Sequence, residues 1–512
     1  MSAVYGRERV ALLTAAEAAA LDDRARDDNG VPGRALMENA GRAAAQVVHR
    51  LYPTGRVVAV VGSGNNGGDA IVALRSLHAW GRDVAYLRVG SSAQDPSRFT
   101  GFDLPRIDDP ADAAFAGAAV LIDGILGTGA SGAPREPAAT VIRRMNASGT
   151  PIVAFDIPTG VDPSTGAIAG EAVEAAVTIQ FGWPKTGALF QPGRARCGRL
   201  VAVEIGFPPL ADDEGTAALI TPDWARARLP ARAPDAHKNS VGRVTLVAGR
   251  KGMAGAAAIA GVSAMRAGAG YARVVSAEAN RTIIQTAVPE ALFVDRSDLD
   301  AVREAVTESD AVLIGPAIGT GDEGSGLLDA VLDAREDRGL VLDADALTIL
   351  AGRDGGLSAL GGRAIATPHP GEMRRLIDRS VPEIRDDPMG AARHLAERTG
   401  VVVLLKGAPS VVAAPGRPVL VAAIGSSDLA TAAMGDQLGG EIAAFLAAGA
   451  HPADAAGLGL FYGGRAAELA GRGRSLTPHD IAERIHQAFD DPGPPASDLD
   501  LPFVVFDQPP RW

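Results

Sequence analysis

The chain has 512 residues and a formal net charge of −12; 47% of its residues are hydrophobic and 21% are charged. This is the composition of a globular protein long enough for two or three domains, and its acidic balance argues against nucleic acid or an anionic membrane as the main partner. No apolar run has membrane-spanning length, the first residues lack the apolar core of a signal peptide, and the single cysteine, Cys197, rules out an intramolecular disulfide. We therefore expect a cytoplasmic protein with no nucleic-acid or membrane partner.

The predicted elements begin with two helices, one opened by a capping box of Thr14 and Glu17 and one starting near Pro32. Apolar runs then alternate with helical stretches. The runs are apolar throughout, which is typical of parallel strands buried on both faces. Strands separated by helices predict a Rossmann-like, doubly wound α/β domain. The runs lie at 57–62, 84–90, 118–124, 151–157 and 175–182.

A stretch rich in Pro, Ala and Asp at 206–236 has the composition of a seam between two domains. After it the α/β pattern starts again, and the small-residue stretch 252–274 predicts a helix. Residues 491–512 predict an extended tail, whose "FVVF" could dock elsewhere on the chain. The strand-like runs of the second half lie at 243–249, 311–319, 339–347, 363–371 and 401–416.

The stretch "VVGSGNNGGD" at 60–69 joins a predicted strand to a helix, and its glycines have the G-x-G-x-x-G spacing of a dinucleotide-binding loop. In a dehydrogenase an acidic residue that holds the ribose follows about 20 residues later, yet the next strand ends "YLRVGSS" without one. The polar cluster at 65–69 indicates sugar hydroxyls, a cation or acid–base chemistry. The alternative is a purely structural turn, in which Asn adopts a left-handed conformation and Asp69 caps the helix.

Two further carboxylates end predicted strands: Asp123 in "LIDGILGTG" and Asp156 in "VAFDIPTG", with Thr159 in the following turn. Because the carboxyl ends of parallel strands line one crevice, we expect Asn66 and Asp69 to meet these residues on the same rim. Oxygen ligands without His or Cys suit a hard cation rather than zinc.

In this order, "LMENAG", "GSGNNGGD", "DGILGTG" and "DIPTGVD" resemble the motifs of the NAD(P)H-hydrate epimerases, the YjeF N-terminal domain, over about residues 10–210. The resemblance implies an epimerase domain at 1–215, with K⁺ bound by Asn66, Asp123 and Thr159. Asp156 would contact the substrate and act in acid–base catalysis, and Lys185 would stabilise charge on the ring. Ala70 departs from the family pattern, which has Gly there. The residues that would hold the hydrated nucleotide are Asn65, Asn66, Gly67, Gly68, Asp69, Gly127, Thr128, Gly129, Ala130, Ser131, Gly132, Ala133 and Asp156.

In the second half, "LLKGAPSVV" places Lys406 at a strand end, where an ammonium can reach a phosphate. Gly435 and Asp436 begin a helix whose N–H groups can form an anion hole, and an aspartate there can accept a proton from an attacking hydroxyl. His369 lies between prolines, and Asp343 and Asp345 follow another strand. Each of these has a structural explanation alone, but together they favour a nucleotide-dependent phosphoryl-transfer site. The P-loop motif G-x-x-x-x-G-K-[ST] is absent from the sequence.

The order of these motifs resembles the ADP-dependent NAD(P)H-hydrate dehydratases, which share the ribokinase-like fold, over about residues 225–490. The resemblance implies ADP as phosphoryl donor, Mg²⁺ to neutralise the phosphates, and Asp436 as base. Ala317, Asp428 and Gln437 depart from the family pattern and bear on affinity. By resemblance the adenine nucleotide would contact Lys406, Gly407, Ala408, Pro409, Ser410 and Gly435, and the hydrate would contact Ala256, Gly319, His369 and Asp436.

The function favoured by the sequence is repair of damaged NADH and NADPH. The first domain would interconvert the (R)- and (S)-hydrates, and the second would dehydrate the (S)-form at the expense of ADP, giving AMP and phosphate. We expect the chain to form a homo-oligomer. Two alternatives stay open: a ribokinase-like small-molecule kinase with an accessory domain, and a first domain that is a scaffold or ligand-sensing module.

Overall fold

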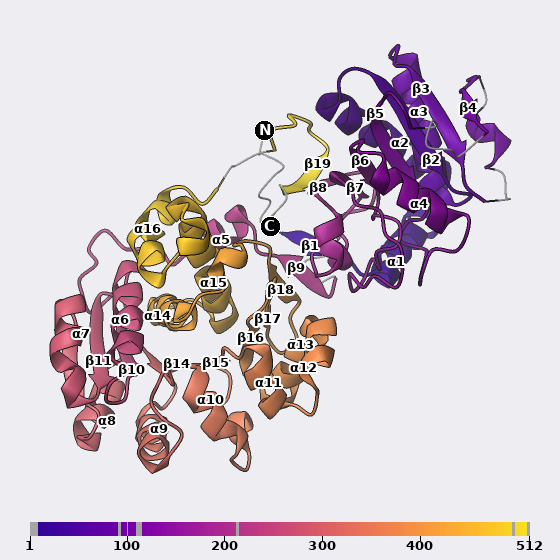
Figure 1. Cartoon of the computed structure of the whole chain (residues 1–512). Helices are drawn as coiled ribbons and strands as arrows, with labels where there is room; N and C mark the ends of the chain where they lie inside the picture. The colour runs from indigo at the N-terminus through magenta and orange to yellow at the C-terminus, as the bar shows by residue number, and fades with distance from the viewer. Residues whose placement is uncertain are drawn as a thin grey trace. The chain divides into compact units, whose positions relative to one another are not determined.

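The computed structural model describes residues 9–90, 94–99, 101–108, 115–210, 215–493 and 497–508. The chain forms two compact units, one of residues 1–218 and 494–512 and one of residues 219–493, whose elements Figure 1 labels. Each unit is an α/β structure around a mainly parallel sheet, which confirms the predicted fold class. Within the part of the chain described, no helix is long and apolar enough to cross a membrane.

The sheet of the first unit has the strand order β19-β8-β7-β6-β5-β2-β3-β4, and all neighbours run parallel except β19 and β8. From β2 the chain first builds outward through β3 and β4, and then returns to the other side of β2 with β5. The order therefore reverses between β2 and β5. The strands are β2 (Arg56–Val61), β3 (Val84–Arg88), β4 (Arg106–Ile107), β5 (Ala118–Gly124), β6 (Ile152–Phe155), β7 (Val177–Phe181), β8 (Arg199–Val203) and β19 (Val504–Gln508), with the short β1 (Val10–Leu12) before them.

Helices cover both faces of this sheet because alternate residues of each strand point to opposite sides. On β2, Val57 and Ala59 join the apolar core beneath α2 and α3, whereas Val58 and Val60 join the core beneath α4. The helices are α1 (Ala15–Asp27), α2 (Gly33–Leu51), α3 (Asn65–Ala79) and α4 (Ala138–Ala147).

The C-terminal strand β19 completes the first unit. It pairs antiparallel with β8, and Val504 is buried in the same core as α2 and α3. The Arg199 side chain on β8 donates through Nε to Asp507 Oδ1 at 2.7 Å and through Nη2 to Asp507 Oδ2 at 2.5 Å. The predicted tail thus contributes an edge strand and a partly buried ion pair.

The sheet of the second unit has the order β18-β17-β16-β15-β14-β13-β10-β11-β12. β17 is antiparallel to both of its neighbours, and the other pairs are parallel. The strand order reverses between β10 and β13. The strands are β10 (Arg243–Val247), β11 (Tyr271–Ser276), β12 (Leu292–Asp295), β13 (Ala311–Ile314), β14 (Gly339–Leu342), β15 (Ala364–Ala366), β16 (Val402–Leu405), β17 (Ser410–Ala413) and β18 (Val419–Ala422); β9 (Ala217–Leu219) lies where the chain passes between the units.

One face of this sheet is covered by α6, α14, α15 and α16, which share a core with Val244 and Leu246 of β10. Thr245, between these two, faces the other side, where its hydroxyl donates to the Ala305 carbonyl of α8 at 3.0 Å. The helices are α5 (Pro222–Arg228), α6 (Ala254–Arg266), α7 (Arg281–Ala287), α8 (Leu299–Thr307), α9 (Asp322–Ala334), α10 (Ala344–Ala351), α11 (Pro370–Leu376), α12 (Val381–Asp386), α13 (Pro388–Thr399), α14 (Met434–Ala447), α15 (Pro452–Ala470) and α16 (Pro478–Asp490).

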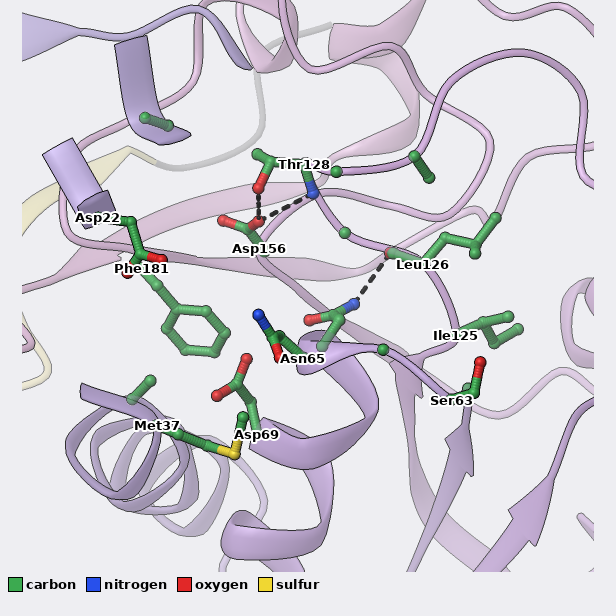
Figure 2. A pocket seen from close by; sticks show the side chains of 18 of the residues that line it. Asp22, Met37, Ser63, Asn65, Asp69, Ile125, Leu126, Thr128, Asp156 and Phe181 are labelled. Carbon is green, nitrogen blue, oxygen red and sulfur yellow. Dashed lines mark hydrogen bonds between the residues drawn. The ribbon is translucent and has the colours of Figure 1, made fainter. Parts of the chain in front are cut away.

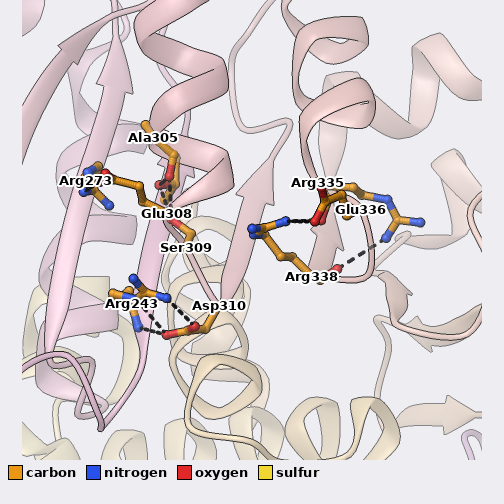
Figure 3. A network of polar contacts seen from close by, with 10 residues as sticks. Arg243, Arg273, Ala305, Glu308, Ser309, Asp310, Arg335, Glu336 and Arg338 are labelled. Carbon is orange, nitrogen blue, oxygen red and sulfur yellow. Dashed lines mark hydrogen bonds and ion pairs between the residues drawn. The ribbon is translucent and has the colours of Figure 1, made fainter.

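A polar network ties together the amino-terminal ends of three strands of the second unit (Figure 3). Arg243, the first residue of β10, donates from its backbone N–H to Asp310 Oδ2 and from Nη2 to Asp310 Oδ1, both at 2.9 Å. The Gly339 N–H of β14 donates to the Asp310 carbonyl at 3.1 Å. These contacts fix the strand ends opposite to those that carry Asp343 and Lys406.

Candidate active sites

A cavity of about 1060 Å³ lies in the first unit beyond the carboxyl ends of β2, β5 and β6, where the strand order reverses. Figure 2 shows the side chains around it. Four residues without a predicted role also line it: Met37, which lies within the motif "LMENAG", and Asp22, Arg98 and Phe181, which lie outside the quoted motifs. The predicted site residues on its wall are Asn65, Asn66, Asp69, the loop 127–133, Asp156 and Lys185.

The glycines of the opening motif have a packing role. A Cβ at Gly62 would lie 2.0 Å from the Ile125 carbonyl oxygen, and a Cβ at Gly67 would lie 2.2 Å from the Gly62 carbonyl oxygen. At Gly68 it would lie 2.6 Å from Arg98 Nη1. Neither Gly67 nor Gly68 belongs to the described cavity wall. The turn from β2 into α3 therefore needs glycine for close packing, while the polar residues between the glycines face the cavity.

Asp156 and Lys185 form a buried ion pair on the cavity wall, with Nζ 2.7 Å from Oδ1. Thr128 donates to Asp156 Oδ2 from its hydroxyl at 2.7 Å and from its N–H at 3.1 Å, as the dashed lines in Figure 2 show. Burial acts to raise the pKa of Asp156, but Lys185 and the Thr128 hydrogen bonds outweigh it and hold the pKa below its usual value. Asp156 has a φ of +66°, a backbone strain of the kind that clusters at functional sites.

The three predicted metal ligands meet behind the loop 127–133. The Thr159 hydroxyl donates to Asp123 Oδ1 at 2.7 Å, and the Thr159 N–H donates to Asp123 Oδ2 at 2.8 Å. Asn66 Nδ2 donates to the Leu126 carbonyl at 2.9 Å, and the buried Asn66 Oδ1 has no hydrogen-bond partner. Burial raises the pKa of Asp123 to about 6, against the hydrogen bonds from Thr159 and Ile125. Among the residues described, no cluster of three His, Cys, Asp or Glu side chains could hold a metal, so any cation here would depend on neutral oxygens as well.

In the second unit Lys406 and Asp343 form an ion pair at the ends of β16 and β14, with Nζ 2.7 Å from Oδ1. Gly435 lies against this pair, because a Cβ there would be 3.2 Å from Asp343 Oδ2 and 3.4 Å from Lys406 Nζ. Asp436 follows in α14. Burial, then the Asp343 carboxylate, raises the pKa of Asp436 to about 6, while Lys406 opposes the shift. The structure thus brings together Lys406, Gly435 and Asp436, and adds Asp343, which the sequence analysis noted only as a carboxylate after a strand.

The remaining predicted residues of this unit lie on neighbouring loops and helix starts. His369 caps α11: its Nδ1 accepts from the Gly371 N–H at 2.9 Å, and its own N–H donates to Glu372 Oε2 at 2.8 Å. The Gly319 N–H donates to Asp345 Oδ2 at 2.8 Å, which fixes the loop after β13. The loop 406–410 joins β16 to β17, and Ala256 lies in the first turn of α6.

Comparison with known proteins places each unit in a family. The profile described as YjeF-related protein N-terminus matches residues 33–187, and the profile described as NAD(P)H-hydrate dehydratase matches residues 244–487. The bifunctional NAD(P)H-hydrate repair enzyme Nnr of Moorella thermoacetica is 33% identical over 493 residues, which is 90% of this chain and 93% of that protein. This chain belongs to the bifunctional NAD(P)H-hydrate repair enzymes. The Escherichia coli repair enzyme Nnr is 36% identical over 451 residues, 85% of this chain and 84% of that protein.

The repair-enzyme family accounts for both units, since an epimerase-type and a dehydratase-type domain are both present. A ribokinase-like superfamily protein of Enterococcus faecalis superposes with a TM-score of 0.51 at 22% identity, covering 55% of this chain and 98% of that one. That likeness supports the ribokinase-like fold of the second unit. Both resemblances drawn from the sequence are confirmed at the level of family and fold.

Proposed function

We propose that this repair enzyme interconverts the (R)- and (S)-hydrates of NADH and NADPH in its first unit, and dehydrates the (S)-form in its second. ADP would be the phosphoryl donor, and AMP and phosphate the products. One observation carries the proposal: each unit holds a Lys–Asp ion pair beyond the carboxyl ends of its parallel strands, Asp156–Lys185 after β6 and β7 in the first and Asp343–Lys406 after β14 and β16 in the second. In each unit the pair stands among the residues that the family motifs select.

In the epimerisation, the ionised Asp156 accepts a proton from the oxygen at the hydroxyl-bearing carbon of the ring. Lys185 keeps that carboxylate charged in a buried setting, and Thr128 holds its orientation. The nucleotide lies along the loop 127–133 and the start of α3. The wall formed there by main-chain and small polar groups suits a long polar ligand.

The oxygen cluster at Asn66, Asp123 and Thr159 fits a K⁺ ion. Asp123 is completely buried and faces no cationic side chain among the residues described, and the unpaired Asn66 Oδ1 offers a further ligand. A bound K⁺ would neutralise Asp123 and hold the Leu126 carbonyl and the following loop in place. Replacing K⁺ by tetramethylammonium should therefore lower epimerisation and leave dehydration of the (S)-hydrate intact.

In the dehydration, Asp436 accepts the proton of the ring hydroxyl while that oxygen attacks the β-phosphorus of ADP, and AMP leaves. The C–O bond between the ring and the phosphate then breaks, phosphate leaves, and the adjacent ring carbon gives up a proton to solvent, which forms the C=C bond. The loop 406–410 and Gly435 bind the adenine nucleotide, and Ala256, Gly319 and His369 contact the hydrate. Mg²⁺, when bound, would neutralise the phosphate charge.

The test uses separated (R)- and (S)-NADH hydrates with ADP, Mg²⁺ and K⁺, and follows the return of NADH absorbance. Asp436→Ala should abolish recovery from both epimers. Asp156→Ala should recover only the (S)-epimer, apart from slow spontaneous epimerisation. Failure of the wild type on the (S)-hydrate would contradict the dehydratase assignment, and stable phosphorylated product without NADH would favour a kinase.

We also propose a cytoplasmic homo-oligomer, which follows from the sequence expectation. Light scattering of the purified chain at micromolar concentration measures its mass directly. A mass of 52.2 kDa would be that of a single chain and would contradict the oligomer.

A further inference from the structure

The cavity of the first unit contains a second buried carboxyl group, that of Asp69, which takes no part in the proposed role of Asp156 and Lys185. Asp69, near the start of α3, is 8% exposed and lines the same cavity as Asp156. Figure 2 shows the two side chains reaching toward the cavity from different elements, Asp69 from α3 and Asp156 from the loop after β6. Among the described residues no hydrogen bond or ion pair reaches Asp69, whereas Asp156 is held by Lys185 and Thr128.

These surroundings separate the protonation states of the two carboxyl groups. Burial raises the pKa of Asp69 well above its usual value, and the carboxylates of Asp156 and Asp22 raise it further, while Arg98 and Lys185 only partly oppose the shift. The pKa of Asp156 is lowered. The cavity therefore holds two buried carboxyl groups of which Asp69 keeps its proton to higher pH than Asp156 does. Such a pair is the arrangement that acid–base catalysis requires.

We propose that Asp69 is the general acid of the epimerisation and that it acts with Asp156 on opposite faces of the hydrated ring. This inference rests on the proposed function of the first unit. It gives Asp69 a catalytic role beyond the nucleotide contact implied by the family motif. An epimerase must act on both faces of one carbon, and two carboxyl groups from different elements in a single cavity meet that need.

In the (R)-hydrate, Asp69 donates its proton to the ring hydroxyl, the C–O bond breaks, water leaves, and the ring-nitrogen lone pair forms a C=N bond. The resulting cation lies between the carboxylates of Asp69 and Asp156, which stabilise its charge. A second water then attacks the opposite face and transfers a proton to Asp156. Exchange with solvent returns the proton to Asp69, and the reverse epimerisation uses the same two groups with their roles exchanged.

The first experiment measures epimerisation and dehydration separately in Asp69→Asn, which keeps the shape of the side chain but removes its acid. We expect the epimerisation kcat to fall by about 100-fold or more, in line with general acid catalysis, with KM changed little. Dehydration of the (S)-hydrate in the second unit should stay within about twofold of wild type. Asp23→Asn is the matched control, because Asp23 is an exposed carboxylate of α1 that pairs with Arg26 and does not belong to the described cavity wall, and it should retain epimerisation.

The second experiment needs no variant. In H₂¹⁸O the wild-type enzyme should incorporate one ¹⁸O per epimerisation, because the oxygen that leaves one face is not the one that attacks the other. Retention of ¹⁶O would mean ring opening without loss of water and would overturn the proposal. So would an Asp69→Asn enzyme whose epimerisation kcat stays within threefold of wild type. A wild type that does not epimerise at all would instead refute the proposed function of the first unit, and this inference with it.

Discussion

Asp436 lies near the carboxylate of Asp343 and the ammonium of Lys406, and these two charges bear on the pH dependence of the dehydratase. Burial and Asp343 raise its pKa to about 6, while Lys406 opposes them. A base must be ionised, so kcat/KM for the (S)-hydrate should fall about tenfold per pH unit below pH 6, because this parameter reports the free enzyme. Measuring kcat/KM for the (S)-hydrate from pH 5 to 8 would show this fall, the acid limb of the pH profile.

A variant of its neighbour tests the cause of this limb. Asp343→Asn removes a negative charge and frees Lys406 from its ion pair. Both changes favour the ionised Asp436, so the acid limb should move to lower pH. A limb that stays in place would show that Asp436 does not determine it.

Ala317 occupies the left-handed region, with φ +52°, in the loop after β13 where the family pattern has Gly. This conformation costs a non-glycine residue about 1 kcal/mol or more. Ala317→Gly should therefore stabilise the second unit by roughly 1 kcal/mol, measured by urea unfolding. Ala301→Gly in α8 is the matched control and should lose about 1 kcal/mol, since that site is helical. If both substitutions lower the free energy of unfolding, the positive φ of Ala317 costs the folded protein nothing that glycine would recover, and the prediction is wrong.

At the residue scale, the sequence predicted part of the shared rim but not how its side chains pair. Asn66, Asp69 and Asp156 line the cavity as expected, whereas Asp123 and Thr159 pair with each other outside the described cavity wall. The Lys185–Asp156 pair depends on a loop after β7 whose path no local pattern fixes. The helix-capping role of His369 was also missed, because a His in that position gives no distinct signal. The glycine spacing in turn reflects backbone packing at Gly62 and Gly67.

At the element scale, α14 contains a buried carboxyl group that has no charged partner in the described part of the chain. Glu441 is 0% exposed, and its two oxygens have no hydrogen bond of good geometry, although Gln437 lies one turn earlier. Burial raises the pKa of Glu441 well above its usual value, and contact with Gln437 only partly offsets this. The folded protein therefore keeps this proton to higher pH than the unfolded chain does.

This difference in proton binding predicts a pH-dependent stability. The contribution of protonated Glu441 to the free energy of unfolding is fully present below the pKa that Glu441 has in the unfolded chain. It is lost as the pH rises through the higher pKa that Glu441 has in the folded protein. Glu441→Gln should match the wild type near pH 4 and exceed it increasingly between pH 5 and 8, measured by urea unfolding. Glu483→Gln, at an exposed position of α16, should track the wild type throughout. A constant offset at every pH would contradict the titration.

Strands that are apolar throughout were predicted well, since burial on both faces leaves a continuous signal; β2 and β5 lie within one residue of their predicted ranges. The small-residue stretch 252–274 was expected to be one helix, and this was wrong. The helix ends at Arg266, and Tyr271–Ser276 forms β11. Small residues give no clear periodicity, so the strand was hidden. Likewise the run 401–416 contains two antiparallel strands, β16 and β17, rather than one.

At the scale of the whole molecule, the first unit is built from both ends of the chain. β19 pairs with β8 across about 300 residues of sequence, and Asp507 lies 308 residues from its partner Arg199. The sequence shows that "FVVF" is apolar but does not identify the strand with which it pairs, because pairing at this separation depends on the assembled sheet. The last strand is therefore expected to stabilise the epimerase unit rather than the dehydratase unit that precedes it in sequence.

A truncation tests this directly. Removing 494–512 deletes β19, whose Val504, Val505 and Phe506 are buried. Burying each such side chain contributes about 1.5–3 kcal/mol, so the loss to the first unit should be on the order of 5 kcal/mol. After graded heating, epimerisation should be lost at lower temperature than in the full chain, while dehydration of the (S)-hydrate survives as before. Removing only 509–512 keeps β19 and should change neither activity. Equal loss of both activities in the longer truncation would mean that the two units do not unfold independently.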